Sequence, residues 1–353
     1  MSETSTAVAP PASSGPHDGP LLEVEDLRVT FGRGNKAFTA VDGVSFSVSP
    51  GQTVGLVGES GCGKSVTSLA IMRLLPARGN TVTGSVRFEG TDLLEQSDSA
   101  MRDMRGADVA MIFQDPLSSL NPVVALGVQV SEVLRRHKGM KQGPANERSE
   151  ELLGKVGIPD PGRRLDEYPH QLSGGMRQRA LIAMALACEP RLLIADEPTT
   201  ALDVTIQAQI LALLKDLVTE SNTALIMITH DLGVVAGLCD EVNVLYAGRI
   251  VERGLRHDLY KVPRHPYTGG LLASIPRLNQ PRGGRLNPVP GSVADNIAWE
   301  QGCAFAPRCS SEVEECRHTP PELVQDDDVS DDRLLRCHNP LTSEPEAEEG
   351  RDE

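Results

Sequence analysis

One short segment constrains the fold of this chain more than any other part of its sequence. Gly58–Ser65 reads G-E-S-G-C-G-K-S and fits the pattern G-x-x-x-x-G-K-[ST]. It follows the apolar run 53–57 and precedes 64–75, where apolar side chains recur at helical spacing. Because a phosphate-binding loop joins a strand to a helix in this way, its position supports the motif. The segment therefore predicts a P-loop within an α/β fold.

The loop predicts a binding site for the phosphates of a nucleotide, and on its own it indicates no more than that. Its glycines let backbone N–H groups surround phosphate oxygens, and the following helix adds the positive end of its dipole. We expect Lys64 to reach the β- and γ-phosphates and Ser65 to ligate Mg²⁺. The predicted nucleotide-binding residues of this segment are Gly58, Glu59, Ser60, Gly61, Cys62, Gly63, Lys64, Ser65 and Val66.

Two carboxylates at the end of an apolar segment predict hydrolytic chemistry. Leu192–Ala195 has the character of a buried strand and is followed directly by Asp196 and Glu197. Asp196 can belong to the Mg²⁺ shell, and Glu197 can polarise an attacking water, a role that contributes about 10²–10⁴-fold to a rate. An acidic strand end that faces solvent is the alternative, which the P-loop earlier in the chain disfavours.

A second segment is suited to binding phosphate. Ser173, Gly174 and Gly175 stand where a helix is expected to begin, so exposed N–H groups, a hydroxyl and the helix dipole form an anion site. Because one subunit hardly needs two phosphate sites, we interpret this one as a contact to a nucleotide held mainly by another subunit. A role of Ser173 as an N-cap explains that residue equally well.

The remaining pattern divides the chain into an α/β core, a mostly helical insertion and a C-terminal part rich in proline, glycine and cysteine. The predicted divisions are a disordered arm at 1–20, an ATPase domain at 21–262 with a helical subdomain at about 116–190, an extension at 263–340, and an acidic disordered tail at 341–353.

Composition excludes several classes of protein. Aromatic residues make up only 3% and the net charge is −15, so neither a base-stacking nor a basic nucleic-acid surface is expected, and no nucleic-acid partner. Most of that charge is local, because residues 321–353 carry −9. The longest apolar runs, such as Ala180–Cys188, are too short for a membrane-spanning helix, which needs about 20 residues. Residues 1–20 also lack the features of a secretory signal.

Four of the seven cysteines fall within the predicted extension. Four thiolates suit either tetrahedral Zn²⁺ or a [4Fe–4S] cluster, and their spacing does not choose between the two. Cys62, Cys188 and Cys239 are expected to be incidental. The four candidate ligands are Cys303, Cys309, Cys316 and Cys337.

Taken together, the motifs of residues 21–340 resemble an ABC transporter ATPase. The resemblance implies a RecA-like core, an antiparallel β subdomain and an α-helical subdomain. It also implies that two cassettes enclose two ATP molecules head to tail. The segments that carry it are Gly58–Ser65, Gln114, Leu172–Gln178, Asp196–Glu197, 201–203 and His230.

The resemblance also implies contacts across such a pair of cassettes. Ser173–Gly175 would contact the γ-phosphate bound by the opposite P-loop, and Asp203 would bridge the two subunits. Phe31 resembles the aromatic residue that stacks on adenine. Phe38 is a rival for that role, and Phe31 could equally be a core residue of its strand.

The catalytic roles follow from the same resemblance. Gln114 would touch the metal or the attacking water, and it would sense the membrane subunit. His230 would hydrogen-bond the γ-phosphate and support the geometry of Glu197. The predicted catalytic residues are thus Glu197, His230 and Gln114, and the predicted Mg²⁺ ligands are Ser65, Gln114 and Asp196.

Finer matches narrow the family to the oligopeptide, dipeptide and nickel importer ATPases. They lie at 111–116, 119–122, 201–211, 265–268 and 271–276. The resemblance implies two permease subunits, a second ATPase cassette, an extracytoplasmic solute-binding protein, and a place at the cytoplasmic face of the membrane. It also favours a [4Fe–4S] cluster over Zn²⁺ at the four cysteines.

We therefore expect a subunit that binds and hydrolyses ATP to import oligopeptides or dipeptides. Nickel or another small solute is the alternative within the family. A soluble ABC ATPase without a transport role is a third hypothesis, which the single cassette and nearly neutral body disfavour. A redox- or metal-sensing role of the cysteines could coexist with transport.

Overall fold

The structure is a computed structural model that describes residues 19–200, 202–275, 289–291, 301–326, 328–329 and 332–342. Most of the predicted arm at 1–20 and most of the predicted tail at 341–353 lie outside the described residues, as does Ala201.

The core of the molecule is a sheet in the order β11-β12-β10-β9-β3-β8-β7-β6. The strands from β9 to β6 run parallel, and β10, β12 and β11 extend the sheet antiparallel at one edge. Their bounds are β3 Thr53–Val57, β6 Val109–Ile112, β7 Leu192–Asp196, β8 Ala224–Thr229, β9 Glu241–Tyr246, β10 Arg249–Leu255, β11 Val324–Gln325 and β12 Leu334–Leu335.

A second, antiparallel sheet packs beside the first in the order β2-β1-β4-β5. Its alternating pattern buries one face, because Leu22, Val24 and Val29 are fully or almost fully buried, as is Leu27, while the polar residues between them are less so. The strands are β1 Leu22–Phe31, β2 Phe38–Val48, β4 Asn80–Phe88 and β5 Thr91–Asp92. This sheet is the predicted antiparallel β subdomain, and the mixed α/β class is confirmed.

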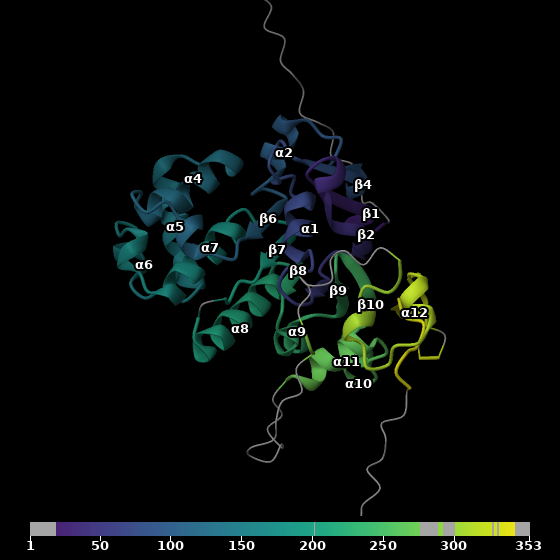
Figure 1. The fold of residues 1–353 in the computed structure, drawn as a ribbon. Coiled ribbons are helices and arrows are strands. Elements are labelled where there is room, and N and C mark those ends of the chain that lie inside the picture. The colour runs from purple at the N-terminus through teal and green to yellow at the C-terminus, as the bar shows by residue number, and fades with distance from the viewer. Residues whose placement is uncertain are drawn as a thin grey trace, which may run out of the picture.

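Helices α3 to α7 form a separate helical region at the end of the sheet that carries β6 (Figure 1). Within it, α4 turns Leu126, Val130 and Leu134 inward at helical spacing. The helices there are α3 Pro116–Ser119, α4 Leu126–Lys138, α5 Gln142–Lys155, α6 Pro161–Arg164, η2 Pro169–Gln171 and α7 Gly174–Leu186.

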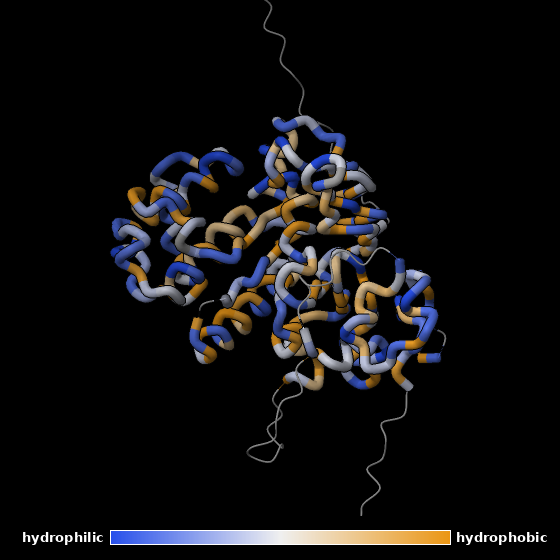
Figure 2. The backbone as a smooth tube through the Cα atoms, viewed as in Figure 1, coloured by the Kyte–Doolittle hydropathy of each residue, from blue (hydrophilic) through white to orange (hydrophobic). Residues whose placement is uncertain are grey.

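The remaining helices flank the two sheets or belong to the extension. They are α1 Lys64–Ile71, α2 Asp98–Met104, α8 Val204–Glu220, α9 Leu232–Leu238, α10 Arg256–Lys261, α11 Pro266–Ala273, α12 Glu315–His318, η1 Gly34–Lys36 and η4 Ala306–Arg308. Apolar segments run along the strands in the middle of the molecule (Figure 2). Among the described residues, no helix has the length and apolar character needed to cross a bilayer.

The C-terminal extension is joined to the core sheet through a buried polar network. Leu335 of β12 pairs with Glu252 of β10, whose side chain is fully buried. The Glu252 carboxylate accepts hydrogen bonds from the backbone N–H groups of Arg264, at 2.8 Å, and His265, at 3.1 Å. It also forms an ion pair with the buried guanidinium of Arg333. These contacts make the extension continuous with the sheet.

Candidate functional site

The predicted site residues gather where the parallel strands end. Ser65 lies just after β3 and its loop, Gln114 after β6, Glu197 after β7 and His230 after β8. Because the carboxyl ends of parallel strands meet at one edge of a sheet, residues distant in sequence become neighbours there. This edge is the candidate active site.

The loop between β3 and α1 needs glycine at its two ends. Gly63 has φ of 103°, and a Cβ there would lie 2.5 Å from the Ala40 carbonyl oxygen. Gly58 approaches the Leu245 carbonyl oxygen so closely that a side chain would collide with it. Only glycine combines a positive φ with such close backbone contacts. The motif glycines are therefore required by packing as well as by room for phosphate.

Lys64 is held inside the loop that it is predicted to serve. Its ammonium donates to the carbonyl oxygen of Gly58 at 2.7 Å and to that of Glu59 at 3.0 Å. The residue is only 5% exposed, so the charge is fixed at the floor of the loop.

Ser65 and Asp196 face each other as expected of Mg²⁺ ligands. The Ser65 hydroxyl donates to Asp196 Oδ1 at 2.9 Å. Burial raises the pKa of Asp196 above its ordinary value, and the bond from Ser65 opposes that shift. A hydroxyl and a carboxylate oxygen are donors that Mg²⁺ accepts beside phosphates, so the two residues fit the ion.

Glu197 is oriented by three neighbours. Gln114 Nε2 and Thr200 Oγ1 each donate to Glu197 Oε2 at 2.9 Å, and His230 Nδ1 lies 3.2 Å from Oε1. Burial alone would raise the pKa of Glu197, but the bonds from Thr200 and His230 outweigh it and leave the pKa below its ordinary value. These contacts therefore favour the ionised form of the Glu197 carboxylate and fix its orientation.

Thr200 is the residue of this site that the sequence analysis missed. It lies three positions after Glu197, and its N–H donates to the Glu197 carbonyl oxygen at 3.1 Å. Glu197 itself has φ of 45°, which turns the chain back at this point. The only signal in the sequence is a threonine three residues after the glutamate, where its hydroxyl can return to the carboxylate if the chain turns. Hydrophobic periodicity does not indicate such a turn.

The residues predicted to reach a second subunit cap helices in this chain. The Ser173 hydroxyl accepts from the Met176 N–H at the start of α7, and Asp203 Oδ1 accepts from the Ile206 N–H at the start of α8. A Cβ on Gly175 would lie 2.9 Å from Ile206, so the two helix starts are close together. Gly174 is exposed beside them.

Phe31 and Phe38 are direct partners across β1 and β2. Phe31 packs against the core of the antiparallel sheet, whereas Phe38 is 39% exposed. Both rings thus stand at the same end of this sheet. The end of β1 and β2 therefore carries both aromatic residues that the sequence offers as adenine contacts.

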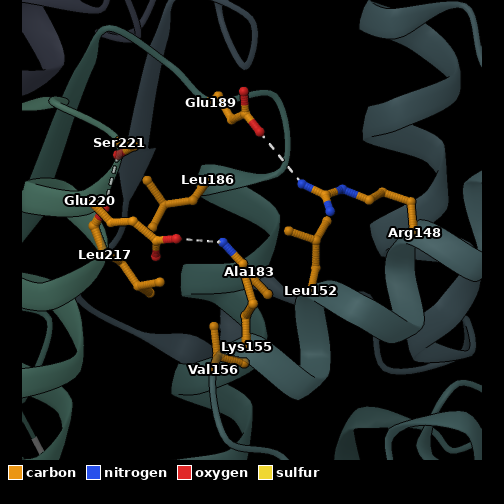
Figure 3. Close-up of a pocket in the computed structure, with 10 residues that line it drawn as sticks. All are labelled: Arg148, Leu152, Lys155, Val156, Ala183, Leu186, Glu189, Leu217, Glu220 and Ser221. Carbon is orange, nitrogen blue, oxygen red and sulfur yellow. Dashed lines mark hydrogen bonds and ion pairs between the residues drawn. The ribbon is translucent and has the colours of Figure 1, made fainter.

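A cavity lies between α5, α7 and the end of α8 (Figure 3). Two ion pairs stand at it, Arg148 with Glu189 at 3.4 Å and Lys155 with Glu220 at 3.1 Å. None of the predicted site residues lines it. It is therefore a junction between the helical region and the core, distinct from the candidate active site.

The four cysteines of the extension share one small region. The Cys303 N–H donates to the Cys316 carbonyl oxygen at 2.8 Å. Burial raises the pKa of Cys303 and Cys309, and it raises the pKa of Cys337 to about 12, with the other thiols adding to each shift. Among the described residues, no three His, Cys, Asp or Glu side chains are placed to hold a metal ion. The arrangement of the thiols therefore does not itself match a four-thiolate site.

The edge of the parallel sheet now defines the class of protein. A phosphate loop, a serine–aspartate pair and an oriented carboxylate at the ends of neighbouring parallel strands are the parts from which P-loop ATPases are built. Comparison with known proteins supports this class and identifies the family within it. The family described as ABC transporter matches residues 41–200, and the oligopeptide/dipeptide transporter C-terminal region matches 251–316.

Two relatives match almost the whole chain. The oligopeptide transport ATP-binding protein OppD of Salmonella typhimurium is 48% identical, over 97% of this chain and 98% of its own length. The dipeptide transport ATP-binding protein DppD of Bacillus subtilis is 52% identical, over 90% of this chain and 94% of its own. The chain therefore belongs to the ABC transporter family, among its oligopeptide and dipeptide transport ATP-binding proteins.

A solved structure supports the fold independently. The ATP-binding cassette MJ0796, as a dimer in a post-hydrolysis state bound to ADP and Pi, has a TM-score of 0.59 to this chain. It is 26% identical and covers 67% of this chain and 98% of its own. The chain is an ATP-hydrolysing ABC cassette with a further C-terminal region.

Proposed function

We propose that this ABC ATPase energises the import of oligopeptides or dipeptides through partner permease subunits. The observation that carries its hydrolytic role is the Glu197 carboxylate, held by Gln114, Thr200 and His230 beside the Ser65–Asp196 pair. The printed names of the relatives, oligopeptide and dipeptide transport proteins, support the choice of solute.

In the proposed mechanism, backbone N–H groups of the phosphate loop bind ATP phosphates while Lys64 exchanges its carbonyl partners for phosphate oxygens. Ser65, Gln114 and Asp196 would hold Mg²⁺, which would supply charge neutralisation at the phosphates. Glu197 accepts a hydrogen bond from the attacking water and draws its proton. Gln114 and His230 keep the carboxylate oriented through that step. We keep Phe31 as the proposed adenine contact.

A second cassette completes the proposed site. Ser173, Gly174 and Gly175 would add N–H and hydroxyl donors to the γ-phosphate of the opposite subunit, and Asp203 would stand at the same contact. The helix starts that carry them are adjacent, and Ser173 and Gly174 are exposed, which supports that use. The solved dimer of a related cassette supports pairing as well.

The other proposed partners are two permease subunits, a second ATPase that is either a copy or a paralogue, and an extracytoplasmic solute-binding protein. This assembly places the chain at the cytoplasmic face of the membrane. We also propose the division into an ATPase domain at 21–262, with its helical subdomain at about 116–190, and an extension at 263–340. Nickel or another small solute remains the alternative cargo.

Reconstitution tests this proposal directly. The chain is co-purified with its membrane partners, inserted into vesicles, and supplied with ATP and a peptide-loaded binding protein. Peptide uptake that depends on hydrolysis is the expected result. If nickel and not peptides stimulates the activity, the proposal that peptides are the cargo is wrong. If the chain hydrolyses ATP and no membrane partner is found in the purified complex, the proposed transport role is wrong.

We further propose that the four cysteines bind a [4Fe–4S] cluster, with Zn²⁺ as the alternative. The location of the four cysteines in one region supports this, although their present placement does not match a metal site. Protein purified without air is expected to contain iron and to absorb visible light, and Cys303→Ser with Cys309→Ser is expected to lose both. A colourless wild-type protein with one zinc contradicts the cluster.

A further inference from the structure

The phosphate loop contains an acidic residue, Glu59, at a place where anionic phosphates are expected to bind. A carboxylate near the loop repels phosphate, and the repulsion is weakened only by solvent, salt or a compensating charge. In this structure the compensating positive charge comes from the C-terminal extension. Arg308 of η4, in the extension, forms a two-pronged ion pair with Glu59.

The geometry of this pair is that of a charge-assisted fork. Arg308 Nη1 donates to Glu59 Oε2 at 2.6 Å and Nη2 donates to Oε1 at 2.9 Å. The arginine side chain is 3% exposed and that of Glu59 is 30% exposed. Parallel N–H···O bonds of this kind are stronger and more directional than a single contact.

Arg308 is itself fixed by the fold. Its Nε donates to the Pro290 carbonyl oxygen at 2.5 Å, and its guanidinium stands 5.7 Å from the ring centroid of Tyr246 and 6.0 Å from that of Phe305. Because these contacts already fix the Arg308 side chain, forming the ion pair with Glu59 costs little additional conformational entropy. The positive charge is therefore preset behind the phosphate loop.

A second residue of the extension contacts the same turn. The Tyr267 hydroxyl accepts a hydrogen bond from the Glu59 N–H at 2.9 Å. The ring is fully buried and meets Tyr246 edge-on at 4.8 Å between centroids. The extension thus binds both the main chain and the side chain of Glu59, so the contact is a built junction.

We propose that Arg308 is a positioning residue that sets the nucleotide affinity of the phosphate loop by neutralising Glu59. The proposal rests on the assignment of Gly58–Ser65 as the ATP site made above. It gives the extension a defined part in ATP binding, because removing one charge of the pair leaves the other beside the phosphates.

A set of four proteins tests it by varying the charge of the pair. The pair is neutral in wild type, negative in Arg308→Met, positive in Glu59→Gln, and neutral again in the double variant. Dissociation constants are measured for the full chain with Mg²⁺ and a non-hydrolysable ATP analogue. Arg308→Met is expected to weaken binding and Glu59→Gln to tighten it, each by about three- to tenfold, and higher salt to reduce both effects.

The double variant separates charge from structure. Restored affinity in Arg308→Met/Glu59→Gln supports neutralisation, because a mere packing defect is not repaired by changing Glu59. Failure of Glu59→Gln to tighten binding overturns the proposal, and that variant leaves the anchors of Arg308 in place. A matched control is Arg148→Met, which removes an arginine from an exposed pair with Glu189 and is expected to keep wild-type affinity.

A further variant distinguishes this inference from the site assignment beneath it. Lys64→Ala is expected to abolish binding of the analogue. If it does so while the four-protein series shows no ordering by charge, the role of Arg308 is wrong and the ATP site stands. If Lys64→Ala binds normally, the site assignment itself is wrong.

Discussion

At the scale of single residues, Glu197 depends on its neighbours for both its charge and its direction. A carboxylate that is partly buried tends to take up a proton, and the contacts from Thr200 and His230 oppose that tendency here. Thr200 and Gln114 bind one oxygen while His230 meets the other. Both oxygens of the carboxylate are therefore oriented by neighbouring side chains.

Glu197→Gln is expected to remove turnover and keep ATP binding, because the amide retains the shape and cannot accept a proton from water. The loss is expected to be about 10²–10⁴-fold in kcat. Steady-state phosphate release measures turnover, and binding of labelled ATP measures affinity. Undiminished hydrolysis in this variant contradicts the assignment of Glu197 as the base.

Thr200→Val is expected to lower kcat by about tenfold, since it removes a hydrogen bond to a charged group. The pKa of Glu197 should rise when that bond is lost, because the bond favours the ionised form. Activity requires the ionised carboxylate, so it should begin to fail at a higher pH than in wild type as the pH is lowered. The pH dependence of kcat checks this shift.

Thr200→Ser provides the matched control for that experiment. It keeps the hydroxyl and is expected to restore the acid limb of the profile toward wild type. An unchanged profile in Thr200→Val would falsify the role of Thr200 in holding the charge on Glu197.

At the scale of elements, the extension depends on one edge of the core sheet. β12 pairs with β10. The buried carboxylate of Glu252, a residue of β10, contacts Arg333 and two backbone N–H groups. An intact buried ion pair contributes little net stability. Removing one partner, however, leaves the other charge buried without compensation, which is strongly destabilising. The junction is therefore sensitive to loss of either partner.

Arg333→Met is expected to lower the free energy of unfolding by about 3–5 kcal/mol, because Glu252 stays buried without its cation. Denaturant unfolding followed by circular dichroism measures the change. Arg317→Met breaks the exposed pair with Glu312 and is expected to leave the free energy of unfolding almost unchanged. Equal costs for the two variants contradict the buried junction.

At the scale of the whole molecule, the candidate active site lies at one edge of the parallel sheet, and the helical region lies at the end of the sheet that carries β6 (Figure 1). The starts of α7 and α8 are adjacent and present Ser173 and Gly174 to the outside. A second cassette can meet this surface. We therefore expect ATP-dependent pairing of two cassettes through this surface.

Gly174→Asp is expected to prevent ATP-driven pairing, because its carboxylate repels the γ-phosphate of the opposite subunit, while ATP binding to the phosphate loop persists. Sedimentation with ATP, in the Glu197→Gln background, measures the pairing. Gly143→Asp introduces the same change at an exposed glycine in the first turn of α5 and serves as the matched control. Equal pairing in both variants contradicts the proposed contact.

The local parts of the site were predictable because their signals are short. The glycines of 58–63, the helical spacing after Lys64 and the apolar strand before Asp196 each lie within one contiguous segment, and each reports backbone conformation directly. The α/β class followed from the same patterns. The position of Thr200 was not predictable, since its role depends on a turn at Glu197 with φ of 45°.

By itself, the sequence determined that this chain has a P-loop, two carboxylates at a strand end and an ATPase core, because neighbouring residues encode strands, loops and helix starts. Tertiary structure alone decided that Arg308 faces Glu59, that Glu252 is buried against Arg333, and that β12 extends the core sheet. Such partners lie far apart in the chain, and no local pattern records which distant charges or strand edges will meet. Folding brings them together because a buried charge or an unpaired strand edge is stable only beside a partner.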